Sequence, residues 1–123
     1  MDPCDKLPLS VMTPQVLRAY VEHGFRPVDG GVELICPAEI EAGIFISSRD
    51  NGVWGLLGGV AVPTTVVTGF IDETQPSGRC AAIAELLPDA QYVQLDHQSH
   101  LGPFSHPGEF AELVLASVAS ATP

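Results

Sequence analysis

The chain has 123 residues, which is enough for one small domain. It carries 15 acidic and only 5 basic residues, and the formal net charge of −10 argues against a nucleic-acid partner, because phosphates attract Lys and Arg. A hydrophobic fraction of 46% argues against global disorder, and no apolar run is long enough for a membrane-spanning helix.

The first half of the chain predicts two helices with a short extended run between them. Thr13 is a suitable N-cap for a helix over 14–23, because a proline follows it at the first helical position and Gly24 supplies a stop. The apolar residues of 32–36 predict a short extended segment after a glycine turn. A second helix is predicted over 37–47.

The second half of the chain predicts an alternation of strands and helices. The β-branched run 64–69 predicts a buried strand, and the helix that follows is expected over 77–87, where a proline ends it. A second strand is predicted over 91–95, a loop over 96–105 and a last helix up to residue 120. This order is βαβα, so we expect an α/β fold with parallel strands and a right-handed crossover.

Polar side chains that could perform chemistry follow the two predicted strands. Asp72 lies in the loop after the first strand and His100 in the loop after the second. Because neighbouring strands are about 4.8 Å apart, an Asp and a His just beyond their carboxyl ends can meet. The Asp would then hold the imidazole in one tautomer and leave its other nitrogen as a general base. Spacing alone also allows a loop-capping Asp72 and a solvated His100.

Several short segments of the second half occur together in a familiar order. They are 69–72 (Gly-Phe-Ile-Asp), 86–90 (Leu-Leu-Pro-Asp-Ala), 92–95 (Tyr-Val-Gln-Leu), 99–104 (Ser-His-Leu-Gly-Pro-Phe) and 106–110 (His-Pro-Gly-Glu-Phe). In this order they resemble the C-terminal part of an α/β-hydrolase. The resemblance implies that Asp72 is the acid and His100 the base of a catalytic triad. In the family a glycine usually stands where this chain has Ser99.

Residues 13–48 are similar to part of the helical cap of epoxide-hydrolase-like and esterase-like members of that family. A cap covers the active site and shapes the substrate pocket. The resemblance therefore divides the chain into a partial cap or lid segment, residues 1–50, and a C-terminal part of the hydrolase core, residues 51–123. The expected architecture is an incomplete α/β-hydrolase fold, with a C-terminal βαβα unit and a small helical cap segment.

The nucleophile of the family is missing from these 123 residues. It normally lies in a Gly-x-Ser-x-Gly turn, and no serine of the chain has glycines at that spacing. Without a nucleophile, the acid and base have nothing to activate. We therefore expect a hydrolase-family fragment that is inactive alone. Two alternatives are half of a hydrolase assembled in trans with a separate N-terminal chain, and a non-enzymatic small α/β binding module.

Other residues could take part in the chemistry. Glu73 and Asp96 are alternative acids, and Cys80 is an alternative nucleophile, although its position predicts a helix interior. His97 and His106 could be ligands, but a surface loop and a helix start explain them as well.

The cysteines bear on the cellular compartment. Cys4, Cys36 and Cys80 lie far apart without a pairing pattern, and the amino terminus lacks a signal-peptide pattern, so we expect free thiols in a reducing cytoplasm. No metal-binding spacing occurs, so no metal or cofactor is expected. The expected partners are a missing N-terminal hydrolase half, or a second copy paired through an exposed sheet edge, and a small-molecule substrate if the enzyme is complete. No membrane partner is expected.

Overall fold

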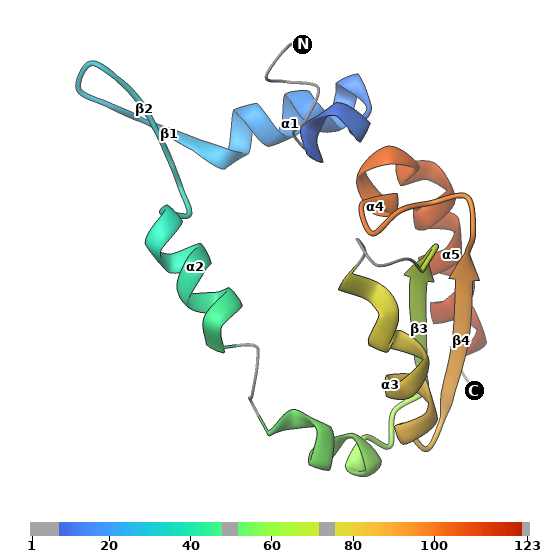
Figure 1. Ribbon diagram of the computed structural model, residues 1–123. Helices are drawn as coiled ribbons and strands as arrows, with labels where there is room; N and C mark the ends of the chain where they lie inside the picture. The colour runs from blue at the N-terminus through green and yellow to red at the C-terminus, as the bar shows by residue number, and fades with distance from the viewer. Residues whose placement is uncertain (1–7, 48–51, 72–75, 122–123) are drawn as a thin grey trace.

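A computed structural model describes residues 8–47, 52–71 and 76–121 of the chain. The second half of the chain forms a small layered unit of strands and helices, and the first half extends from it as an arc of separate elements (Figure 1). Short 3-10 helices occur at η2 (Pro8–Val11), η3 (Val53–Gly59) and η4 (Pro76–Arg79).

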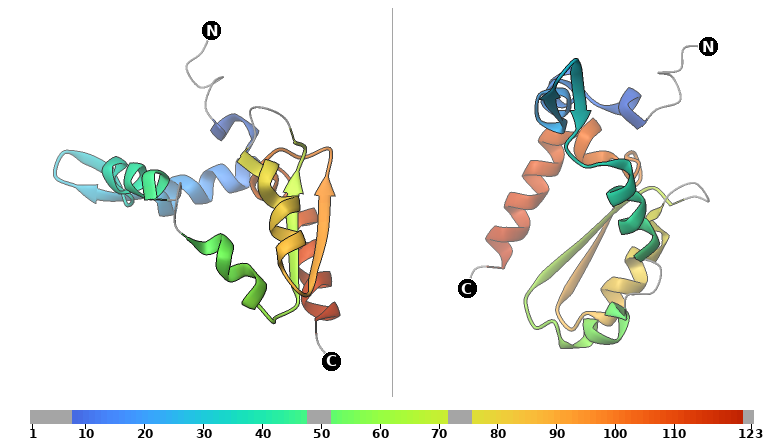
Figure 2. Two further views of the ribbon diagram at one scale, coloured as in Figure 1. Left: turned by 60° about the horizontal axis from the view of Figure 1, so that its bottom comes forward. Right: turned by 90° about the vertical axis from the view of Figure 1, so that its left-hand side faces the viewer.

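The layered unit is built on two parallel strands. β3 (Thr64–Gly69) pairs with β4 (Ala90–Leu95) in a register that joins Thr64 to Ala90 and Gly69 to Leu95. The connection between them contains α3 (Cys80–Leu86), which packs on one face of the sheet, while α5 (Pro107–Ser120) lies against the other face (Figure 2). The βαβα order and the parallel pairing predicted from the sequence are therefore confirmed.

Few side chains of the described residues are fully buried. Leu87, directly after α3, is the buried apolar residue, and Thr68 and Gln98 are the buried polar ones. The β3 residues are half-buried to buried because helices cover both faces of their strand. Large apolar side chains elsewhere stay exposed, including Ile44 at 60% and Leu115 at 69%. The buried core around the sheet is therefore small, and many large apolar side chains remain exposed.

The first half of the chain begins with α1 (Pro14–Gly24), which is capped as the sequence predicts. The Thr13 hydroxyl accepts a hydrogen bond from the amide of Val16 at 3.3 Å. The Thr13 amide donates to the carbonyl of Phe104 at 3.3 Å. This bond attaches the start of the arc to the second half of the chain.

A β-hairpin follows α1 and was predicted only in part. β1 (Phe25–Val28) and β2 (Gly31–Leu34) pair antiparallel, and Gly30 makes the turn at a φ of 84°, which glycine adopts without strain. The Arg26 side chain forms an ion pair with Glu33 across the hairpin at 2.5 Å. The predicted extended run 32–36 is the second of these strands; the first is short and contains a proline, which masks a strand pattern.

Two further elements differ from the sequence-based expectation. A single helical turn, α4 (Gly102–Ser105), interrupts the predicted loop 96–105, because the carbonyls of Leu101 and Gly102 accept hydrogen bonds from residues three and four further along. Cys80 is the first residue of α3 and does not lie in a helix interior, since the preceding turn is η4. The other predicted helix of the first half, α2 (Ala38–Ser47), is present.

Candidate active site

The carboxyl ends of β3 and β4 lie side by side, and the loop after β4 folds back over them. The amide of Gln98 donates to the carbonyl of Leu95 at 3.0 Å, which turns the chain directly after the strand. The amide of Phe70 donates to the Gln98 carbonyl at 2.7 Å, which joins this loop to the end of β3. These two bonds bring the loop that carries His100 to the point where β3 ends.

Gly69 makes this close approach possible. A Cβ atom at position 69 would overlap the backbone carbonyl oxygens of Gln98 and Ser99. Because those atoms belong to the backbone, they cannot move aside by a change of rotamer. Gly102 has a similar role, since a Cβ there would overlap the side-chain oxygen of Gln98. Two glycines therefore determine how tightly the loop packs.

His100 lies in this loop, at the rim of a small cavity. The side chain of His100 is exposed and borders a cavity of about 230 Å³ at the ends of the two strands. The cavity is lined by Val67, Thr68, Gly69, Leu95, Gln98, Ser99, His100, Gly102, Pro103 and Phe110. The predicted base therefore lies at the carboxyl end of the sheet, and it borders the same cavity as the last residues of β3.

The predicted acid, Asp72, and its alternative, Glu73, lie outside the described residues. The described part of this segment ends at Ile71, two residues beyond β3. Asp96, the second alternative, follows β4 and accepts a hydrogen bond from the Gln94 side-chain amide at 2.6 Å. Its carboxylate is therefore engaged along β4.

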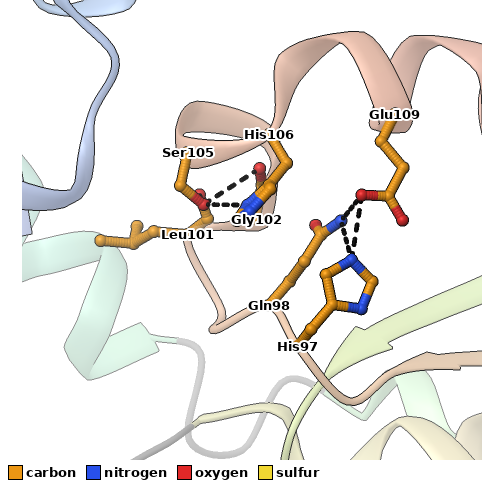
Figure 3. A network of polar contacts seen from close by, with 7 residues as sticks. All are labelled: His97, Gln98, Leu101, Gly102, Ser105, His106 and Glu109. Carbon is orange, nitrogen blue, oxygen red and sulfur yellow. Dashed lines mark hydrogen bonds and ion pairs between the residues drawn. The ribbon is translucent and has the colours of Figure 1, made fainter.

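A polar network that the sequence did not predict fixes the His100 loop to α5 (Figure 3). Gln98 is 1% exposed, and its side-chain Nε2 donates to Glu109 Oε2 at 2.8 Å. The Nε2 atom of His97 lies 3.0 Å from the same carboxylate oxygen and donates to it, since a carboxylate can only accept. The loop on one side of His100 is thus tied to the first turns of α5.

The electrostatics of Glu109 follow from this network. The hydrogen bond from His97 lowers the pKa of the Glu109 carboxyl from its ordinary value of 4.5. Partial burial acts in the opposite direction, while the charge of His97, the Gln98 amide and the charge of His106 reinforce the lowering. His97 is therefore a surface residue with a specific partner. The pairing of His97 with Glu109 is visible only in the folded structure, because the two residues belong to different elements.

His106 belongs to the same surface. Its ring stacks edge to face with that of His97 at a centroid distance of 5.7 Å. Its Nδ1 lies 2.8 Å from the hydroxyl of Ser105. The helix start that the sequence predicts for His106 is confirmed, because it is the N-cap residue of α5.

Two buried polar atoms also belong to this region. The Oγ1 of Thr68 and the Oε1 of Gln98 have no hydrogen-bond partner among the described residues, and both residues line the cavity beside His100. A cavity of this size has room for water, and water can satisfy such atoms.

The remaining candidate groups of the described segments are not gathered into a site. Within residues 8–47, 52–71 and 76–121, no cluster of three His, Cys, Asp or Glu side chains could hold a metal ion. Cys36 is exposed, Cys80 is half-buried, and both are free thiols. No helix of the described part of the chain is long and apolar enough to cross a membrane.

Comparisons with known proteins agree with this architecture at the level of the fold. No protein-family model matches the chain, and no curated protein matches it. Among solved structures, E-2-(acetamidomethylene)succinate hydrolase matches with a TM-score of 0.74 and 19% sequence identity, over 89% of this chain and 41% of that one. VinJ matches with a TM-score of 0.51 and 19% identity, over 93% of this chain and 51% of that one.

The fold is therefore that of part of an α/β hydrolase. The chain spans about two fifths of the length of the first of these structures and about half of the second.

Proposed function

We propose that this chain contributes the acid and the base of an α/β-hydrolase active site, with Asp72 as the acid and His100 as the base. The observation that carries the proposal is the position of His100. Its loop is bonded to the end of β3 through the Phe70 amide and the Gln98 carbonyl, and Asp72 follows β3 by three residues. In open α/β sheets, ligands bind at the carboxyl ends of the strands.

The proposed chemistry is acyl transfer or a related hydrolysis. A nucleophilic serine hydroxyl would give its proton to one ring nitrogen of His100, and His100 would later return it to the leaving group. The Asp72 carboxylate would accept the other ring N–H and keep the imidazole in the required tautomer. A small molecule with a hydrolysable acyl group is the proposed substrate. An epoxide would require a carboxylate nucleophile in place of the serine, because a serine that opened the ring would be left as a stable ether.

The nucleophile must come from polypeptide outside these 123 residues. No Gly-x-Ser-x-Gly turn occurs in the sequence, and the matched structures are about twice as long as this chain or longer. We use the term upstream polypeptide for the polypeptide encoded directly before residue 1, in the same or in a neighbouring reading frame. We propose that it carries the nucleophile and the oxyanion-hole donors.

Residues 1–50 are proposed to act as a partial cap over this site. The support is the bond from the Thr13 amide to the carbonyl of Phe104, four residues after His100. In Figure 1, α1 lies beside α4, on the side of the sheet where the two strands end. A substrate at the strand ends would then lie between the cap and the His100 loop.

The test is hydrolysis of a short acyl ester by this chain purified together with the upstream polypeptide. We expect turnover that is lost in His100→Ala. His23→Ala is the matched control, because it removes an exposed imidazole at the end of α1, outside the His100 loop and its polar network, and should retain most of the activity. Equal activity in wild type and His100→Ala would refute the assignment of the base.

A further inference from the structure

The loop that carries His100 takes its shape from short-range bonds. The Gly102 amide donates to the carbonyl of Ser99 at 2.9 Å, and the Leu101 amide donates to the Ser99 hydroxyl at 3.2 Å. These bonds join residues of the same loop. They therefore define the turn of the chain at His100, but they do not determine where that turn lies relative to β3 and α5.

Residue 98 joins the loop to two other elements. Its backbone carbonyl accepts a hydrogen bond at 2.7 Å from the amide of Phe70, which lies directly after β3. Its side-chain Nε2 donates to Glu109 Oε2 on α5 at 2.8 Å. Because Gln98 precedes His100 by only two residues, a displacement of Gln98 would also displace His100. The contacts of Gln98 therefore determine where His100 lies relative to the end of β3.

Glu109 accepts hydrogen bonds from two consecutive residues of this loop. His97 Nε2 lies 3.0 Å from the same carboxylate oxygen that Gln98 contacts (Figure 3). The hydrogen bond from His97 lowers the pKa of Glu109 from its ordinary value of 4.5, so the carboxyl group is ionised at neutral pH. Hydrogen bonds to an ionised acceptor are stronger than those between neutral groups. One charged group of α5 therefore holds the segment that leads into His100.

The Gln98 side chain is confined as well as hydrogen-bonded. It is 1% exposed, and a Cβ atom at Gly102 would overlap its Oε1 atom. A buried amide that loses its acceptor keeps an unsatisfied N–H group, which is costly. Without the Glu109 carboxylate, we expect the Gln98 side chain to leave this position and the loop to move with it.

Glu109 also lies in the first turn of α5, where a negative charge is favourable by itself. This second effect depends on charge, whereas the contacts with His97 and Gln98 depend on an acceptor oxygen. Glu109→Gln separates the two effects, because glutamine keeps an acceptor oxygen and has no charge.

We infer that Glu109 is a positioning residue for the proposed base: through Gln98 and His97 it holds the loop in which His100 accepts and returns the proton. This inference rests on the proposed function, because it takes His100 as the base. A misplaced catalytic group slows the chemical step more than it weakens substrate binding. Loss of the Glu109 contacts should therefore lower kcat and leave KM nearly unchanged.

The test measures hydrolysis of a short acyl ester by this chain purified with the upstream polypeptide. Glu109→Ala should lower kcat about tenfold or more and change KM by less than about twofold, and Glu109→Gln should recover most of the lost kcat. Glu112→Ala is the matched control, because it removes the same charge from an exposed position about one turn further along α5. Its kcat should equal that of the wild type.

A double variant tests whether Gln98 and Glu109 act together. Gln98→Ala should lower kcat about as much as Glu109→Ala does, and the double variant should lose little more than either, because residues that act as a unit are not additive. Urea unfolding of each variant identifies conditions under which all of them are folded. Additive losses of kcat would overturn the inference, since they would mean that the two residues act independently.

A second measurement follows the loop in the isolated chain and does not involve catalysis. The amide of Phe70 donates to the Gln98 carbonyl, so its hydrogen exchange reports whether the loop stays at the end of β3. We expect faster exchange in Glu109→Ala than in the wild type, and wild-type exchange in Glu112→Ala. Unchanged exchange in Glu109→Ala would overturn the inference.

The kinetic outcomes separate this inference from the proposed function. If His100→Ala is inactive but Glu109→Ala keeps the wild-type kcat, the inference fails and the proposed function stands. A loss in Glu109→Gln as large as that in Glu109→Ala also overturns the inference, because the charge of Glu109 would then be what matters. If Phe70 exchange responds as expected but His100→Ala leaves hydrolysis intact, Glu109 holds the loop and the proposed function fails.

Discussion

The side chain of Gln98 donates a hydrogen bond to Glu109 at 2.8 Å, and this contact connects the loop after β4 to the helix α5. Gln98 is 1% exposed, whereas Glu109 lies at the surface and also accepts from His97. The loop that holds the proposed base is therefore positioned by a buried amide close to His100.

Gln98→Ala should destabilise the chain. The substitution removes a buried side chain and its hydrogen bond to a carboxylate, and we expect a loss of about 1–3 kcal/mol in the free energy of unfolding. Urea unfolding followed by circular dichroism measures it. The control is Gln91→Ala on the exposed part of β4, which should change the stability by less than about 0.5 kcal/mol. Equal effects of the two substitutions would contradict the positioning role of Gln98.

Gly69→Ala should be more disruptive than its size suggests. The added methyl group would overlap the backbone of residues 98 and 99, so the loop must move away from β3. We expect a loss of about 1–3 kcal/mol and altered amide chemical shifts from residue 96 to residue 102. Gly108→Ala is the control, since a Cβ there meets no atom within 4 Å. A Gly69→Ala variant as stable as Gly108→Ala would show that the loop is not packed as described.

The Glu109 pair should make stability depend on pH in the acid range. Because His97 lowers the pKa of Glu109 in the folded chain, the pair stabilises the fold above 4.5, the ordinary glutamate value, and this contribution is lost as the pH falls through the lowered folded value. Urea midpoints of the wild type should therefore fall more steeply below pH 4.5 than those of Glu109→Gln. Parallel curves for the two proteins would contradict the assigned pair.

The isolated 123-residue chain should have no ester or epoxide hydrolase activity above background. The reason is chemical, because a general base and an acid need a nucleophile to activate, and no Gly-x-Ser-x-Gly turn is present. Incubation with a short acyl ester and with a styrene-oxide-type epoxide tests this. Turnover by the isolated chain that disappears in His100→Ala would show that the nucleophile lies within these residues.

Much of the second half was predictable from the sequence. The β-branched run 64–69 predicts β3 because such side chains pack well in a sheet covered on both faces, and parallel pairing follows from the helix between the strands. The start of α1 was predictable because the hydroxyl of Thr13 and the following proline act locally, and the structure shows the cap bond. The strand propensity of 64–69 and the cap of α1 depend on residues that are close together in the sequence.

Other features depend on contacts that periodicity does not reveal. The single turn α4 lies in a segment with a glycine and a proline, which indicated a loop. The pairing of Glu109 with both His97 and Gln98 requires the loop to fold back on α5, and sequence separation alone cannot predict that distance. An apolar groove beside β3 forms between a strand and a helix more than 40 positions apart, so only their packing reveals it.

The most direct test of the proposed acid and base is the tautomer of His100, measured by nitrogen-15 NMR of its ring in the wild type and in Asp72→Asn. We expect the neutral ring to carry its proton on Nδ1, toward Asp72, and Asp72→Asn to abolish this preference. Asp96→Asn should leave it unchanged. A His100 ring that carries its proton on Nε2 in the wild type, with no response to Asp72→Asn, would contradict the assignment.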